Sequence, residues 1–157
     1  MPDNRQKEKM LRQAQKSASN PNQSIQATEA KLKKYTAAYG EEDQSSPAFV
    51  VLKYFRSDKQ CFSEWNKVEL EAFSAFNIKM NQLTWQQIAS SGGKLGNKTG
   101  MGYTQHDKLD IPRNQLGISE DITFFELRVT NKARVHGFRA CGAFFLIRLD
   151  KDHDLMP

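Results

Sequence analysis

The last third of the chain constrains the fold most, because apolar and polar residues alternate there in consecutive short runs. These runs cover residues 122–130, 133–139 and 143–150, with turn-like sequences between them. Strict alternation over five to eight residues is typical of half-buried strands, and short turns join strands that are antiparallel neighbours. The sequence therefore predicts an antiparallel meander in this part of the chain.

The pattern also predicts which residues of the last run share a face of the sheet. Successive side chains of a strand point to opposite faces, so residues two apart lie on the same side. We expect Phe145, Ile147 and Leu149 to lie on one face, and Arg148 and Asp150 to lie on the other with Phe144 and Leu146.

Upstream of the meander the sequence indicates one strand and two helices. Residues 48–55 are nearly all apolar or aromatic, as in a strand covered on both faces. Apolar residues then recur with helical spacing over 63–83, and a second helix begins at Thr84, where Gln87 completes a capping box. The expected apolar face of the longer helix consists of Trp65, Val68, Ala72, Phe73, Phe76, Met80 and Leu83. The predicted fold is α+β, with two helices packed on an antiparallel sheet of about four strands.

The N-terminal part differs from the rest in charge and composition. Residues 1–34 contain eight Lys or Arg and three Asp or Glu, which accounts for the whole net charge of +5. We expect a flexible basic arm at 1–22, an amphipathic helix over 23–39 with an acidic linker to 46, and a compact domain over 47–157. No secretory signal, no membrane span and only two cysteines are present, which favours a cytoplasmic location and no membrane partner.

The segment 92–102 is rich in glycine and carries Lys94 and Lys98. It fits neither the Walker A pattern nor the dinucleotide-binding glycine pattern. It is therefore either a plain flexible loop or a loop whose lysines reach a polyanion. The histidines and cysteines lack the spacing of known metal sites, so we expect no metal and no cofactor.

The meander concentrates cationic side chains, namely Arg128, Arg134, Arg139 and Arg148, around His136. A guanidinium fork suits the geometry of a phosphate, and imidazole moves protons near neutral pH. If these side chains shared a water-facing concavity, they would form a site for phosphodiester chemistry. The same residues also fit ordinary cross-strand ion pairs and a half-buried histidine, and a slip of register by one residue would separate them.

The order of parts at 124–129, 133–139 and 144–150 resembles the RelE/ParE-like toxin superfamily. That resemblance implies a metal-independent endoribonuclease or RNA-directed inhibitor, with RNA, including ribosome-bound RNA, as its target. The residues that it implies to be catalytic are Arg128, Arg134 and Arg139 for phosphate binding, His136 as general acid or base, and Tyr103 or His106 in assistance. Contacts to nucleic acid would come from Lys94, Lys98, Lys132 and Arg148. An antitoxin-like protein would contact the 23–39 helix.

The chain is also similar to small uncharacterised proteins of bacterial mobile elements. The shared pattern combines Thr84-Trp85-Gln86-Gln87-Ile88 with His136-Gly137-Phe138-Arg139 and with Asp150-Lys151-Asp152-His153. Two other classes of function fit the same residues. One is a non-catalytic module that binds nucleic acid or protein through the basic arm and an arginine-rich sheet face. The other is an interaction factor whose 23–39 helix lies in the groove of a partner.

Overall fold

The computed structural model describes residues 38–39, 45–91, 100–106 and 109–155. The chain divides into two units, Met1–Ala38 and Tyr39–Pro157, and the description below concerns the second. The expected basic arm, the acidic linker up to 44 and nearly all of the 23–39 helix lie outside the described residues. Among the described helices, none is both long enough and apolar enough to cross a membrane.

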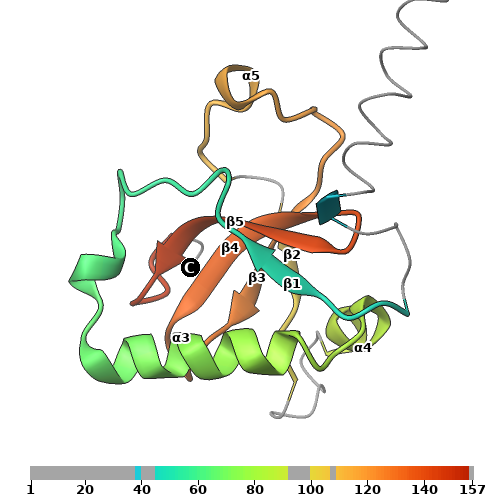
Figure 1. Ribbon diagram of the computed structural model, residues 1–157. Coiled ribbons are helices and arrows are strands. Elements are labelled where there is room, and N and C mark those ends of the chain that lie inside the picture. The colour runs from blue at the N-terminus through green and yellow to red at the C-terminus, as the bar shows by residue number, and fades with distance from the viewer. Residues whose placement is uncertain (1–37, 40–44, 92–99, 107–108, 156–157) are drawn as a thin grey trace, which may run out of the picture. The chain divides into compact units, whose positions relative to one another are not determined.

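The described part forms a five-stranded mixed sheet in the order β1-β5-β4-β3-β2 (Figure 1). Strand β1 is parallel to β5, and every other pair is antiparallel. The α+β class and the C-terminal meander are confirmed, but the sheet has five strands rather than about four. The strands are β1 (Phe49–Val51), β2 (Thr104–His106), β3 (Phe124–Arg128), β4 (Arg134–Ala140) and β5 (Ala143–Asp150).

Strand β1 keeps only three residues of the expected 48–55 run, and the three-residue edge strand β2 was not predicted. Residues 104–106 do not alternate between apolar and polar, because the first two side chains of β2 are exposed at the sheet edge.

The helices are the 3-10 turn η1 (Phe62–Glu64), α3 (Lys67–Met80), α4 (Trp85–Ser90) and α5 (Arg113–Leu116). Helix α3 is shorter than the expected 63–83 because Asn66 caps it: the Asn66 side chain accepts from the Glu69 N–H, and the Glu69 carboxylate accepts from the Asn66 N–H. This start places Val68 at 73% exposure, so its assignment to the apolar face was wrong. The capping box between Thr84 and Gln87 is confirmed.

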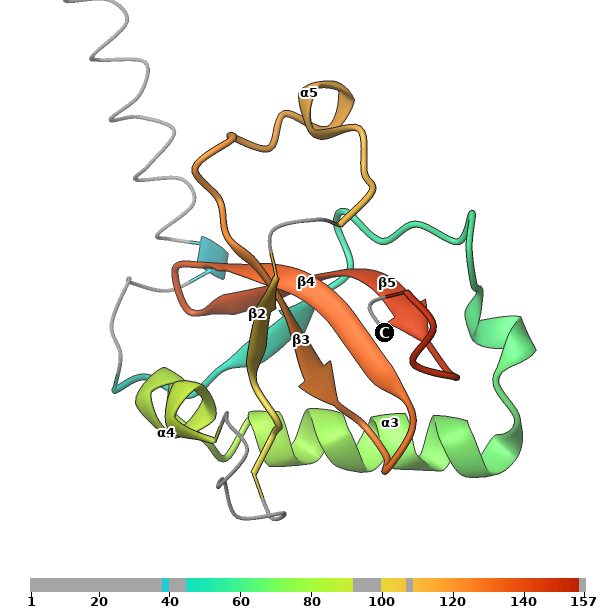
Figure 2. The ribbon, with the colours of Figure 1, turned by 180° about the vertical axis from the view of Figure 1, so that it is seen from behind.

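Two separate clusters of apolar side chains cover the two faces of the sheet. Helix α3 runs along one side, and the segment that carries α5 lies on the opposite side (Figures 1 and 2). The cluster under α3 and α4 includes Trp65, Phe76, Met80, Trp85, Ile88, Phe125, Leu127, Val135, Phe144, Leu146 and Leu149. The cluster on the other face includes Leu109, Ile118, Phe124, Phe138, Ala143, Phe145 and Ile147.

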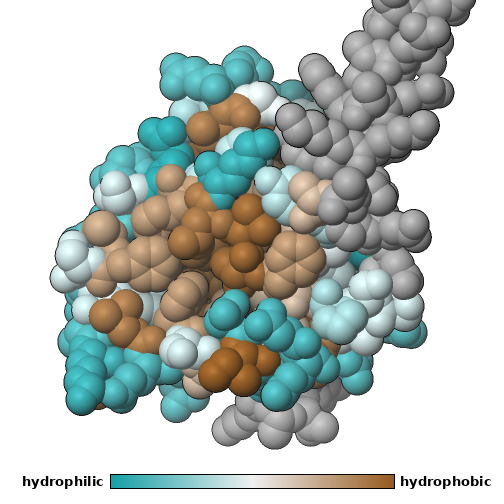
Figure 3. Space-filling view, viewed as in Figure 1, coloured by the Kyte–Doolittle hydropathy of each residue, from teal (hydrophilic) through white to brown (hydrophobic). Residues whose placement is uncertain are grey.

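Some large apolar side chains remain on the surface. The space-filling view shows apolar residues gathered around the middle of the face that carries β1 (Figure 3). The exposed large hydrophobic residues among those described are Leu52, just after β1, and Val68, Leu70 and Ile78 on α3.

A β-bulge in β5 decides which side chains share a face. His136 pairs with Arg148, but the next residue, Gly137, pairs with Leu146, so Ile147 is an extra residue. After the bulge the alternation is reversed, and Leu149 joins the cluster under α3. The expected grouping of Leu149 with Phe145 and Ile147 is therefore wrong, and Arg148 and Asp150 face away from α3.

Candidate active site

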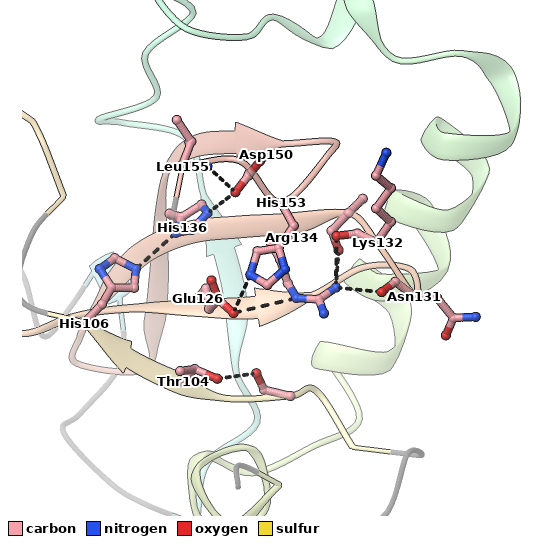
Figure 4. Close-up of polar contacts among 12 residues, drawn as sticks. Thr104, His106, Glu126, Asn131, Lys132, Arg134, His136, Asp150, His153 and Leu155 are labelled. Carbon is pink, nitrogen blue, oxygen red and sulfur yellow. Dashed lines mark hydrogen bonds and ion pairs between the residues drawn. The ribbon is translucent and has the colours of Figure 1, made fainter. Parts of the chain in front are cut away.

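The reversed alternation after the bulge brings a buried carboxylate to a buried imidazole. His136 Nε2 lies 3.0 Å from Asp150 Oδ2, and His136 Nδ1 lies 3.0 Å from His106 Nε2 (Figure 4). The side chains of His136 and Asp150 are fully buried, whereas His106 on the edge strand β2 is half-buried. Residues from three strands thus form one chain of hydrogen bonds from the core to the sheet edge.

The environment of Asp150 favours its charged form. Burial alone would raise the pKa of this carboxyl, but hydrogen bonds from His136 and from the backbone N–H groups of Asp154 and Leu155 outweigh it and lower the pKa. A charged Asp150 holds a proton on His136 Nε2. In neutral His136 the other nitrogen, Nδ1, is then an acceptor for the N–H of His106.

A second polar group lies beside this chain of hydrogen bonds. Glu126 is the cross-strand neighbour of His136, and its carboxylate pairs with Arg134 at 3.7 Å and with His153 at 3.3 Å. His153 has a left-handed backbone, with φ of 60°. The three histidines of the chain therefore lie in one cluster, although they come from positions 106, 136 and 153 of the sequence.

Arg134, an expected phosphate ligand, is engaged by the protein itself. Its side chain is almost fully buried, and Nη1 donates to the backbone carbonyls of Thr130, Lys132 and Ala133. Burial and the nearby charge of Arg128 lower the pKa of Arg134, while Glu126 acts in the opposite direction. Arg134 thus closes the turn between β3 and β4.

Arg139 and Arg148 are likewise engaged by groups of the protein itself. Arg139 donates to the Cys141 carbonyl and stacks over the ring of Trp85, on the α4 side of the sheet. Arg148 is buried and donates to Asp58 and to the Asp110 carbonyl. The water-facing arginine concavity that the sequence predicts is therefore not formed.

Four further candidates lie at other places. Tyr103 packs against Phe125, whose side chain belongs to the cluster under α3, with ring centroids 4.7 Å apart. Lys132 pairs with Asp152 at 2.7 Å on the surface. Lys94 and Lys98 lie outside the described residues. Of the residues expected to be catalytic, only His106, His136 and Arg134 belong to the histidine cluster.

Sequence patterns did not single out Glu126 as a member of this site, and the segment Asp150-Lys151-Asp152-His153 was noted only as part of a shared pattern. The D-x-x-H pattern does bring both its ends to the cluster, but Asp150 binds His136 and His153 binds Glu126. It is the register of β3 against β4 in the structure that places Glu126 opposite His136.

Within the described residues, no three His, Cys, Asp or Glu side chains are grouped as a metal ion would require. Comparison of the chain with protein-family models, with curated proteins and with solved structures returned no match.

Proposed function

We propose that this protein cleaves RNA by acid–base chemistry at the histidine cluster, with His106 as general base and His153 as general acid. The observation that carries this proposal is the hydrogen-bonded chain Asp150–His136–His106. A carboxylate that orients an imidazole through its second nitrogen is the arrangement by which proteins set the tautomer and basicity of a histidine. Here the arrangement is extended by one imidazole toward the sheet edge.

His136 itself is not a candidate for contact with substrate, because its side chain is fully buried and both ring nitrogens are engaged. It acts in this proposal as a positioning residue. His106 and His153 are the partly exposed histidines, and His153 is held by Glu126. This division of roles differs from the expectation that His136 transfers the proton.

RNA fits such a site because it supplies its own nucleophile. His106 takes the proton of a 2′-hydroxyl, and the 2′-oxygen forms a bond to the adjacent phosphorus. The bond from phosphorus to the 5′-oxygen breaks, and that oxygen takes a proton from His153. The products are a 2′,3′-cyclic phosphate and a 5′-hydroxyl. A deoxyribose strand lacks the 2′-hydroxyl and is not cleaved.

Substrate access requires a local movement at the sheet edge. Nδ1 of His106, the atom that would take the proton, is shielded from solvent in this conformation. Strand β2 has three residues and pairs on one side with β3. Short edge strands open at lower free-energy cost than central strands, so β2 is the element that we expect to move.

The test is cleavage of total RNA in EDTA by the full chain, with identification of the new termini. We expect 2′,3′-cyclic phosphate ends, and a loss of about a hundredfold or more in rate for His106→Gln and for His153→Gln. The two variants should lose opposite limbs of the pH–rate profile. Gln105→Ala is the matched control, because Gln105 is exposed on the same strand.

Two results would contradict the proposal. Undiminished cleavage by folded His106→Gln protein would remove the histidine cluster from the chemistry. Wild-type protein that binds RNA without producing cyclic phosphate ends would instead be a non-catalytic binding module.

A further inference from the structure

We propose that the outer face of helix α3 binds a second copy of this chain, so that the two α3 helices pack antiparallel about a twofold axis at Ala75. This inference does not depend on RNA cleavage. Helix α3 lies at the margin of the described body, with the sheet on one side and no described element on the other (Figures 1 and 2). The outer face consists of Val68, Glu71, Ala72, Ala75, Ile78 and Lys79.

Helix α3 carries three of the four large apolar side chains that the described residues expose. Two of them belong to the outer face, where Val68 is 73% exposed and Ile78 is 57% exposed. Successive residues of a helix are about 100° apart, so both lie within about 60° of Ala75, which is exposed as well. The buried residues Phe76 and Met80 belong to the cluster against the sheet. Apolar side chains grouped on a helix face that is turned away from the core are typical of a contact with a partner.

The middle of the outer face is low, which lets a second helix approach closely. Ala72 and Ala75 carry one methyl group each, whereas the larger apolar side chains lie toward the two ends of the face. A hollow of about 320 Å³ borders these two alanines and leaves room for side chains of a partner. In an antiparallel pair centred on Ala75, residues equally far from Ala75 lie at the same level. Ile78 of one copy then lies at the level of Ala72 of the other, so a larger side chain meets a smaller one.

The charges of the outer face favour a second copy as the partner, and they favour the antiparallel direction. Glu71 and Lys79 lie one turn before and one turn after Ala75. In the antiparallel pair each Glu71 lies at the level of Lys79 of the other copy, and the twofold axis repeats this contact. A parallel pair would place each charge beside an equal one. The side chain of Glu71 is 65% exposed, and its pair with Lys67 at 3.8 Å is a weak surface contact.

The size of the face limits the strength of the contact. Each copy contributes one helix of 14 residues. We expect such a face to bury less area than the roughly 1,200–2,000 Å² of a stable protein–protein interface. The expected product is therefore a reversible dimer with a dissociation constant of about 10–100 µM.

The test is sedimentation equilibrium of the full chain at concentrations from about 1 to 500 µM, over which the mass should rise from monomer to dimer. Ala75→Glu places two carboxylates at the twofold axis and should weaken dimerisation at least about tenfold. Glutamate is a good helix former, so the helix is retained. The matched control is Ala89→Glu, because Ala89 is an exposed alanine of α4. Its dissociation constant should stay within about twofold of the wild type.

An exchange of charges tests the antiparallel pairing. Glu71→Lys and Lys79→Glu should each weaken dimerisation by about three- to tenfold, because each brings like charges to the same level. The chain with both substitutions should dimerise within about twofold of the wild type. If it dimerises no better than the single variants, the antiparallel pairing of α3 is contradicted.

Two other results would overturn the inference. One is wild-type dimerisation by Ala75→Glu protein that is shown to be folded by its thermal transition. The other is a full chain that stays monomeric at every concentration. If that monomer binds vesicles of neutral phospholipid, the outer face of α3 contacts lipid instead of a second copy.

Discussion

Fully buried polar side chains are costly unless each polar atom finds a partner, and His136 and Asp150 satisfy this requirement together. Asp150 accepts from His136 and from the backbone N–H groups of Asp154 and Leu155, so its carboxylate is stabilised by three donors. These contacts also fasten the turn after β5 to the sheet. The same residues that form the candidate relay therefore stabilise the fold.

The lowered pKa of Asp150 predicts a pH dependence of stability. Its pKa in the folded state lies below the ordinary value of 3.8, so the charged carboxylate stabilises the protein above that pH. This contribution is lost as the pH falls through the folded pKa. We expect Asp150→Asn to lower the free energy of unfolding by about 2 kcal/mol at pH 7 and by clearly less at pH 3. Urea unfolding at both values measures this, and an equal loss at both would contradict it.

At Gly137 the neighbouring atoms leave no room for a side chain. A Cβ atom there would overlap the carbonyl oxygen of Phe145 and approach the ring of Phe144 to 2.9 Å. We expect Gly137→Ala to lower the free energy of unfolding by about 3 kcal/mol, measured by urea unfolding.

Gly117 provides the control for that substitution. It has φ of 66°, but a Cβ atom added there would meet no other atom within 4 Å. Asparagine tolerates the left-handed backbone, so Gly117→Asn should change the free energy of unfolding by no more than about 0.5 kcal/mol. A Gly137→Ala variant as stable as this one would show that β5 shifts to accommodate the methyl group.

Local hydrogen bonds decide where the helices begin and end. The pairing between strands decides which face of the sheet each side chain occupies. The bulge in β5 leaves Ile147 without a partner on β4, and its carbonyl accepts from the Arg56 N–H instead. The chain after β1 thus supplies a donor to this carbonyl. At the other end of the body, the capping box at Asn66 decides where α3 begins.

That capping box gives a prediction at the level of the helix. Asn66→Ala removes the acceptor for the Glu69 N–H, and we expect the free energy of unfolding to fall by about 1 kcal/mol. Asn66→Asp keeps the acceptor and should restore wild-type stability to within a few tenths. Thermal unfolding of both variants measures the difference, and equal losses in both would show that the cap contributes nothing.

The charge of the molecule is divided unequally along the chain. Residues 1–34 carry the whole net charge of +5, and residues 35–157 are neutral in sum. Within the described body, Arg134 and Arg148 are buried and paired. Long-range attraction to a polyanion must therefore come from the N-terminal segment, while recognition depends on local groups.

This division predicts the salt dependence of RNA binding. Replacing Lys31, Lys33 and Lys34 by Gln should reduce the slope of log K against log salt by about 2, if each contacts one phosphate of single-stranded RNA. The control with the same change of charge replaces three exposed lysines of the body, Lys53, Lys59 and Lys67. Fluorescence anisotropy over a salt series measures both slopes. Equal reductions would show that the lysines of the body contribute as much to the electrostatic contact as those of the N-terminal segment.

Local pattern was sufficient to predict the class of the fold. The alternation in the C-terminal runs predicted three strands close to the observed β3, β4 and β5, and the Thr84 capping box predicted the start of α4. These features depend on residues that are close together in the chain, so they can be recognised from the sequence alone. The short strand β2 and the parallel pairing of β1 with β5 depend on distant partners and carried no such signal.

The candidate site could be predicted in part. His106 and His136 were named from their residue type, but their hydrogen bond joins positions 30 residues apart. The arginines were expected to face water together, but Arg134 and Arg148 are buried and paired within the protein, and alternation along a strand does not show such tertiary contacts. Asp150 was assigned with Phe144 and Leu146, and the bulge at Ile147 moved it to the face of His136.

The sequence by itself determined the α+β class, the meander and the charged N-terminal segment, since composition and short-range periodicity are properties of the chain alone. Only the tertiary structure decided that three histidines and two carboxylates meet on one face and that Val68 of α3 stays exposed. The physical reason is that a single extra residue in β5 inverts every following side chain, and the close approach at Gly137 is where β4 accommodates it.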